Sequence, residues 1–269
     1  MTRALFTQDT VAPAAAARLM GHPIAVMLDV DGTLAPIVPR PQDALVPNDT
    51  RQVLAQLTAL PDVHVVLVSG RAAFDVQRMV PVRNVWVIGN HGFEVIAPDG
   101  EEQTPAELAP VRGAVARAAR RLEVLVAPVP GVTVEDKGWT MSVHYRRADE
   151  AVVPRLLDSV RQVALPLGLR VTEGKKVIEV RPPTRIDKGT AVIRLGTTLG
   201  AFAEGASVLF VGDDRTDEDA FRALRARHAA AVTARVTHGD EQTPTSAEFT
   251  VNDTTEVLAF LEWLLRQRL

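Results

Sequence analysis

The chain has 269 residues, of which 46% are hydrophobic, and its formal net charge at pH 7 is −3. This size allows one large hydrophobic core, or one core together with a smaller domain. The small negative charge gives no basic field for nucleic acid, so a local cluster of positive groups has to meet any anionic substrate. The chain has no cysteine, which excludes disulfides, zinc–thiolate sites and cysteine nucleophiles.

The amino terminus does not resemble a signal peptide, because Gln8, Asp9 and Pro13 interrupt its apolar residues. No segment reaches the roughly 18 uninterrupted apolar residues of a membrane span. We therefore expect a soluble cytoplasmic protein with no membrane or nucleic-acid partner, either monomeric or weakly homo-oligomeric.

Short apolar runs alternate with helical patterns in the first hundred residues. Residues 24–30 are typical of a buried strand, and Asn48, Asp49 and Thr50 predict the cap of a helix with an apolar face. Further strands are predicted at residues 63–68 and 85–88. Strands that alternate with helices favour a parallel sheet covered by helices on both faces.

The same alternation returns near the end of the chain, and a different pattern lies between. Helices are predicted at residues 188–199, 217–227 and 253–269, and a strand at 207–211. In the middle block, helices are predicted at 105–122 and 149–165, and strand pairs at 132–135 with 139–145 and at 169–172 with 177–181. Because this block is not βαβ, it is interpreted as an inserted domain.

Polar side chains follow the predicted parallel strands at the points where the strands end. Asp29 and Asp31 end the first strand, and side chains alternate along a strand, so both acids face the same side. Two adjacent carboxylates are costly unless a cation or a proton lies between them. Ligands bind at the carboxyl ends of parallel strands. The other polar residues predicted there are Ser69, Asn90, His91, Asp213 and Asp214.

These residue types suit phosphoryl transfer. A carboxylate can attack phosphorus only when a cation and hydrogen-bond donors neutralise the phosphate oxygens, and Mg²⁺ favours carboxylate ligands such as Asp29 and Asp213. We predict that Asp29 is the nucleophile and that Asp31 moves the proton, first to the leaving sugar oxygen and then from water. Ser69 and Lys188 are predicted to bind the phosphate and hold its charge.

The order of these motifs resembles the haloacid dehalogenase superfamily: Asp29-x-Asp31, then Ser69, then Lys188, then Gly212-Asp213-Asp214-x-x-Asp217. The resemblance implies a Rossmann-like, doubly wound parallel-sheet α/β core at residues 1–103 and 184–269. The inserted block, residues 104–183, has the position of the superfamily's C2-type cap and implies a smaller α+β domain that selects the substrate.

Finer matches resemble the trehalose-6-phosphate phosphatases, above all the segments 174–182 and 212–219. This resemblance implies magnesium-dependent hydrolysis of trehalose 6-phosphate through an aspartyl-phosphate, as a step in trehalose biosynthesis. It implies metal ligands at Asp29, the backbone carbonyl of Asp31, Asp213 and Asp214, while the choice between Asp214 and Asp217 as the second acid at the metal stays open.

The resemblance also implies residues that contact the sugar or its phosphate. In the inserted block, Lys175 and Lys176 compete for one role, and the alternation of side chains favours neither strongly. Arg71 is expected either to contact substrate or to donate to a carboxylate across the core. The implied substrate-binding residues are Arg71, Asn90, His91, Glu135, Lys137, Arg146, Lys176 and Glu179.

Three other functions are compatible with the motifs. Another sugar phosphatase of the superfamily, acting on sucrose phosphate or a glycosyl-glycerate phosphate, would keep the same core residues. A sugar phosphotransferase would use the same Asp29 and Asp31. A noncatalytic sugar-phosphate sensor is disfavoured, because both aspartates are present.

Overall fold

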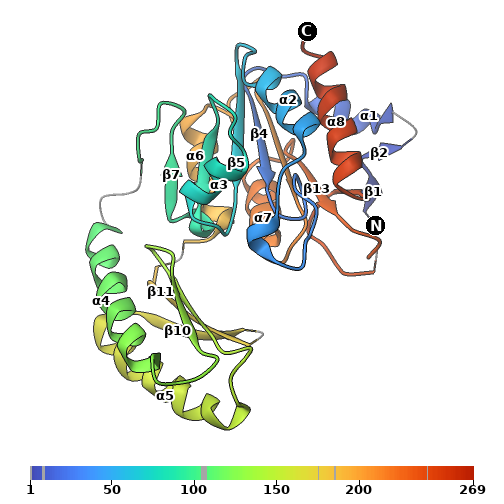
Figure 1. Ribbon diagram of the computed structural model, residues 1–269. Coiled ribbons are helices and arrows are strands. Elements are labelled where there is room, and N and C mark those ends of the chain that lie inside the picture. Colours follow the sequence, from blue (N-terminus) through green and yellow to red (C-terminus); the bar gives the residue numbers. More distant parts are fainter. Residues whose placement is uncertain (1, 8–9, 104–107, 175, 185, 241) are drawn as a thin grey trace. The chain divides into compact units, whose positions relative to one another are not determined.

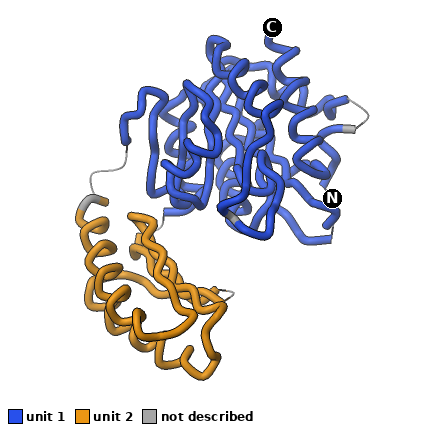
Figure 2. The backbone as a smooth tube through the Cα atoms, in the orientation of Figure 1, with its two compact units in different colours: residues 1–103, 186–269 blue, residues 104–185 orange. Residues whose placement is uncertain are grey.

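The computed structural model describes residues 2–7, 10–103, 108–174, 176–184, 186–240 and 242–269. The chain divides into two compact units, residues 1–103 with 186–269 and residues 104–185 (Figure 2). None of the helices within the described ranges has the length and apolar character that a bilayer span requires.

Unit 1 is built on an eight-stranded sheet with the order β1-β14-β13-β12-β4-β5-β6-β7 (Figure 1). Every neighbouring pair is parallel except β6 and β7. Its strands are Arg3–Ala4 (β1), Ile24–Asp29 (β4), Val63–Val68 (β5), Trp86–Gly89 (β6), Glu94–Ile96 (β7), Ser207–Gly212 (β12), Val232–Val236 (β13) and Phe249–Val251 (β14).

The helices of unit 1 cover both faces of this sheet. A two-stranded hairpin, Phe6–Thr7 (β2) with Thr10–Val11 (β3), and 3-10 turns at Pro41–Asp43 and Asn90–Gly92 complete the unit. The helices are Pro13–Arg18 (α1), Asn48–Leu57 (α2), Ala73–Met79 (α3), Lys188–Thr198 (α6), Asp217–Arg227 (α7) and Thr254–Arg266 (α8).

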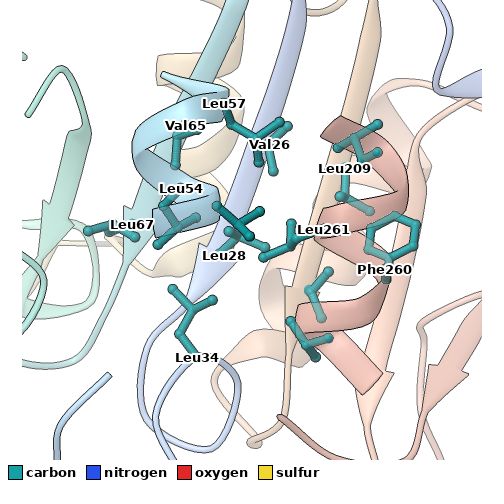
Figure 3. Close-up of a cluster of buried hydrophobic side chains, with 14 of the residues drawn as sticks. Val26, Leu28, Leu34, Leu54, Leu57, Val65, Leu67, Leu209, Phe260 and Leu261 are labelled. Carbon is teal, nitrogen blue, oxygen red and sulfur yellow. The ribbon is translucent and has the colours of Figure 1, made fainter. Parts of the chain in front are cut away.

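Side-chain alternation on β4 separates two hydrophobic layers. Val26 and Leu28 pack with α2 and α8 on one face (Figure 3), whereas Met27 packs with α6 and α7 on the other. All residues of β4 are buried, as expected for a central parallel strand. Asp29 has the parity of Met27, so the strand directs it toward the face where α6 lies.

Unit 2 has a four-stranded antiparallel sheet with the order β10-β11-β9-β8. One face of the sheet, including Met141, Val143, Ile178 and Val180, packs against two helices. The elements are Ala109–Val126 (α4), Thr133–Asp136 (β8), Met141–His144 (β9), Glu150–Val152 (3-10), Val153–Ala164 (α5), Leu165–Leu167 (3-10), Arg170–Gly174 (β10) and Val177–Arg181 (β11).

Several elements differ from the predictions. The predicted cap at Asn48 is wrong: α2 already begins there, and Thr50 is buried on its inner face while Pro47 precedes the helix without a side-chain cap. No strand is predicted between residues 228 and 252, yet β13 and β14 lie there, and β1 to β3, α1 and β7 are likewise not predicted. The first residues of the helix predicted at 105–122 lie outside the described residues.

Candidate active site

The two acids of the Asp-x-Asp motif follow the central strand of the sheet. β4 lies between β12 and β5, and the chain proceeds from β4 toward β7 in one direction but later builds β12 and β13 on the other side. In open α/β sheets, ligands bind at the carboxyl ends of the strands where the strand order reverses in this way. Asp29 is therefore at the position where the topology favours a site.

A buried lysine connects three segments at this point. Lys188, at the start of α6, is only 2% exposed, and its Nζ lies 2.7 Å from Asp29 Oδ1 and 2.7 Å from Asp217 Oδ1. The other oxygen of Asp217 accepts the backbone N–H groups of Asp213 and Asp214, each at 3.0 Å. Both oxygens of Asp217 are thus engaged in orienting Lys188 and the loop that follows β12.

The charges around Lys188 change the pKa values of the groups. Burial alone lowers the pKa of Lys188, but the carboxylates of Asp29, Asp217 and Asp214 outweigh it and the pKa is raised. Burial raises the pKa of Asp29 to about 7, against the opposing effect of Lys188. Burial also raises the pKa of Asp217. The single ammonium of Lys188 thus does not neutralise all of the surrounding carboxylates.

Asp213 completes a cluster of three carboxylates, and one of its own oxygens is available to a divalent cation. Asp29, Asp213 and Asp217, hereafter the acidic cluster, each offer one oxygen, and these three atoms lie within 4.8 Å of one another. Burial, reinforced by Asp217 and Asp214, raises the pKa of Asp213 to about 7. Its buried Oδ1 has no hydrogen-bond partner within the described part of the chain. A buried carboxylate oxygen without a hydrogen-bond partner suits Mg²⁺, because this ion takes hard oxygen ligands.

Asp214 is held differently from Asp213. Its Oδ1 accepts from the Thr216 hydroxyl and from the backbone N–H groups of Thr216 and Asp217. Burial raises its pKa, but Lys188 and these hydrogen bonds outweigh the burial, so the pKa is lowered overall. Asp214 therefore stays ionised in the loop just before α7, with Lys188 Nζ 3.8 Å away.

A glycine is required where the backbone after β4 meets this cluster. Gly32 has a φ of +83°, and a Cβ built on it would lie 2.1 Å from Asp213 Oδ2. The Asp-Gly pair of the motif therefore has two physical causes, a left-handed turn and a close approach to a carboxylate.

Asp31 lies outside the contacts of Lys188 and binds Arg71 instead. Arg71 Nε and Nη2 donate to Oδ2 and Oδ1 of Asp31, both at 2.6 Å, a bidentate geometry that orients the carboxylate. This hydrogen bonding raises the pKa of Arg71. Ser69 is buried, and its Oγ accepts the backbone N–H of Arg71 at 3.1 Å.

The turn after β6 contacts the Ser69–Arg71 segment through its backbone. Asn90 N–H donates to the carbonyl of Arg71 at 2.7 Å, and His91 N–H donates to that of Ser69 at 3.0 Å. Asn90 is fully buried, and the ring of His91 lies over Gly70. The contacts described for Asn90 and His91 are thus with residues 69–71 of unit 1.

One face of the sheet in unit 2 is polar. Cross-strand pairing aligns Glu135, Ser142 and Glu179. The buried hydroxyl of Ser142 lies 3.0 and 3.1 Å from the two carboxylate oxygens of Glu179. His144 Nε2 lies 2.8 Å from Glu135 Oε2. Both predicted carboxylates are thus held in place by a neighbour on β9.

The predicted basic residues of unit 2 are placed less uniformly. Lys137 Nζ is 3.7 Å from Glu135 Oε2, and Lys176, with a φ of +64°, forms an ion pair with Glu150. Arg146 is exposed in the turn after β9. Lys175, the alternative to Lys176, lies outside the described residues.

The structure adds His238, which no pattern in the sequence indicates. Its Nε2 lies 3.7 Å from Asp213 Oδ2, and it follows β13, a strand that was not predicted. Ser142 and His144 lie in the strand predicted at residues 139–145, but only the pairing of β9 with its neighbours assigns them a partner.

The sheet order and the acids that follow the central strand define an α/β fold of the haloacid dehalogenase type. A family model described as trehalose-phosphatase matches residues 27–255. The chain belongs to the trehalose-phosphatase family.

One similar relative and one similar solved structure bear the name of this family, and a second relative has another name. The chain is 37% identical over 251 residues to a trehalose-phosphate phosphatase of Mycobacterium avium, with 93% of this chain and 64% of the relative aligned. It is also 37% identical over 249 residues to an uncharacterized glycosyl hydrolase of Mycobacterium tuberculosis, but spans only 18% of its length. The structure of Aspergillus fumigatus trehalose-6-phosphate phosphatase aligns with 99% of both chains, at 27% identity and a TM-score of 0.71.

Proposed function

We propose that this chain hydrolyses trehalose 6-phosphate to trehalose and phosphate in a magnesium-dependent reaction through an aspartyl-phosphate. The observation that carries the proposal is the buried Lys188 between Asp29 and Asp217, beside Asp213, whose Oδ1 has no hydrogen-bond partner among the described residues. Family membership supports the phosphatase reaction. The names of the aligned relatives support trehalose 6-phosphate as the substrate.

Asp29, the backbone carbonyl of Asp31, Asp213 and Asp214 are the proposed ligands of the metal. When bound, Mg²⁺ neutralises charge on the phosphate oxygens and the surrounding carboxylates. Asp217 is assigned to Lys188 rather than to the metal, because its two oxygens already accept from Lys188 and from two backbone N–H groups.

In the first step, Asp29 Oδ attacks phosphorus, and the bond between phosphorus and the sugar oxygen breaks. Asp31 gives its proton to that oxygen, so the sugar leaves as an alcohol. Lys188 and the Ser69 hydroxyl stabilise the phosphoryl oxygens during the transfer. In the second step, Asp31 takes a proton from water and the water oxygen attacks phosphorus. The bond between phosphorus and the Asp29 oxygen breaks, so that Asp29 returns to a carboxylate and inorganic phosphate leaves.

The polar face of unit 2 is proposed to bind the disaccharide. Glu135 and Glu179 accept from sugar hydroxyls, and Lys137, Arg146 and Lys176 donate to hydroxyl or phosphate oxygens. This proposal is supported by the alignment of the two glutamates on one face of the sheet.

A panel of phosphate esters tests the proposal. Phosphate release is measured from trehalose 6-phosphate, sucrose 6-phosphate, glucose 6-phosphate and p-nitrophenyl phosphate, each with Mg²⁺ and with EDTA. We expect trehalose 6-phosphate to have the highest kcat/KM and EDTA to abolish release. A preference for another sugar phosphate refutes trehalose 6-phosphate as the substrate, but it remains compatible with hydrolysis of phosphate esters.

Asp29→Asn tests the nucleophile. Its carboxamide cannot form an acyl phosphate, so turnover should fall below detection while the melting temperature is retained. Glu204→Gln, at an exposed carboxylate of the same unit, is the matched control and should retain activity. Normal phosphate release by Asp29→Asn refutes the aspartyl-phosphate mechanism.

An added acceptor sugar tests the phosphotransferase alternative. Transfer of phosphate from the substrate to this sugar by the unmodified protein, at the expense of free phosphate, would favour the phosphotransferase.

A further inference from the structure

The turn that follows β6 has an unusual backbone. Asn90 and His91 have φ values of +49° and +55°, and Gly92 follows with +109°. Consecutive left-handed residues that are not glycine are rare and persist only where the surroundings hold them. The contacts that hold this turn in its conformation therefore indicate its role.

One side of the turn holds the Ser69–Arg71 segment. The N–H groups of Asn90 and His91 donate to the carbonyls of Arg71 and Ser69. A Cβ added at Gly70 would lie 2.4 Å from His91 Cε1, so the imidazole packs directly on the glycine backbone. Two hydrogen bonds and one ring thus fix three consecutive residues.

The other side of the turn meets the start of α6. A Cβ at Gly92 would lie 2.8 Å from the carbonyl oxygen of Asp187 and 2.8 Å from Ala191 Cβ. Asp187 caps α6 and directly precedes Lys188. The turn thus fills the space between the segment with Arg71 and the helix with Lys188.

Arg71 in turn binds both oxygens of Asp31 at 2.6 Å. A guanidinium in this bidentate geometry fixes the orientation of the carboxylate. This orientation matters in the second step of the proposed reaction, in which Asp31 takes a proton from water.

We propose that the Asn90-His91-Gly92 turn is a positioning element that holds Arg71 on Asp31, so that Asp31 is set as the base for hydrolysis of the aspartyl-phosphate. Asn90, His91 and Arg71 then act through Asp31 rather than by contacting the sugar. This inference rests on the proposed function.

The test uses p-nitrophenyl phosphate, because nitrophenolate leaves without a proton and its release does not need Asp31 as an acid. Gly70→Ala adds a methyl against the His91 ring. We expect single-turnover nitrophenol release to change less than about threefold, while the steady-state rate falls roughly 10²-fold, since a general base contributes at least this factor. A burst near one nitrophenol per protein should appear.

A double variant identifies the contact responsible. Gly70→Ala combined with His91→Gly removes the ring that the methyl meets and suits the left-handed φ, so it should recover at least roughly tenfold of the steady-state rate. Gly113→Ala, whose added Cβ meets only Arg117 Nη1 at 3.4 Å, is the matched control and should give no burst. Arg71→Met should show the same burst as Gly70→Ala.

Three results overturn the inference. Equal loss of single-turnover and steady-state rates in Gly70→Ala means that the turn does not act on the second step. A double variant as slow as Gly70→Ala shows that His91 does not transmit the effect. Failure of Arg71→Met to give a burst removes Arg71 from the pathway. Absence of nitrophenol release by the unmodified protein with Mg²⁺ instead refutes the proposed function. In that case, thermal melting still measures the coupling between Gly70→Ala and His91→Gly.

Discussion

Replacing Asp213 with asparagine should make the metal-free protein less sensitive to pH. Burial and the neighbouring carboxylates raise the pKa of Asp213 from 3.8 to about 7, and its side chain is only 12% exposed. A raised carboxyl pKa means that the folded protein binds the proton more tightly than the unfolded chain does. The stability that this proton confers is complete below about pH 4 and is lost as the pH rises through about 7.

The magnitude follows from the size of the rise. A change from 3.8 to about 7 corresponds to about 4 kcal/mol over the whole window, of which about 2.5 kcal/mol falls between pH 5 and pH 8. Asp213→Asn removes the titrating group, so the free energy of unfolding of the variant minus that of the unmodified protein should increase by about 2.5 kcal/mol from pH 5 to pH 8. For a unit of this size that is about 5 to 10 °C in melting temperature.

Urea and thermal unfolding in EDTA at pH 5 and pH 8 measure this difference. Glu204→Gln, which removes an exposed carboxylate, should leave it near zero. Adding Mg²⁺ at pH 8 should stabilise the unmodified protein more than Asp213→Asn, because a ligand that binds only the folded state stabilises it by mass action. A difference that is flat within about 1 kcal/mol between the two pH values refutes the reasoning.

Three further changes give distinct outcomes. Gly32→Ala, where a Cβ would lie 2.1 Å from an oxygen of the acidic cluster, should abolish Mg²⁺-dependent phosphate release, whereas Gly100→Ala, at a φ of +88° in open space, should cost only the backbone strain of about 1–2 kcal/mol in urea unfolding. Lys188→Met should lower the free energy of unfolding in EDTA by about 3–5 kcal/mol at pH 8, because it leaves buried carboxylates unpaired, and the loss should shrink at pH 5. Ser142→Ala removes the hydroxyl beside Glu179 and should raise KM for the preferred sugar phosphate about fivefold without changing kcat for p-nitrophenyl phosphate; an unchanged KM contradicts that role.

The strands and most helices that position the site were predictable from local pattern. Residues 24–28 are apolar without interruption because both faces of a central parallel strand are buried. The helix predicted at residues 217–227 has these bounds in the structure, and three acids in its first turn with two arginines in its last suit the helix dipole. β13 and β14 were missed, because short strands depend on neighbours distant in the sequence for their hydrogen bonds.

Alternation along a strand correctly directs Asp29 to the face of α6, but it does not say which cation meets it. Lys188 is 159 residues away, and only the sheet order brings its helix to the end of β4. The different partners of Asp29 and Asp31, Lys188 for one and Arg71 for the other, are likewise consequences of tertiary contacts.

The sequence by itself determined the residue types of the site, their order and the class of fold, because strand periodicity and glycine turns are local properties. The tertiary structure decided which carboxylate is left with an unpaired oxygen, which one is committed to Lys188, and that Arg71 and the turn at Asn90 and His91 contact the core. Such assignments depend on distances between segments far apart in the chain, and burial then sets the charge each group can carry.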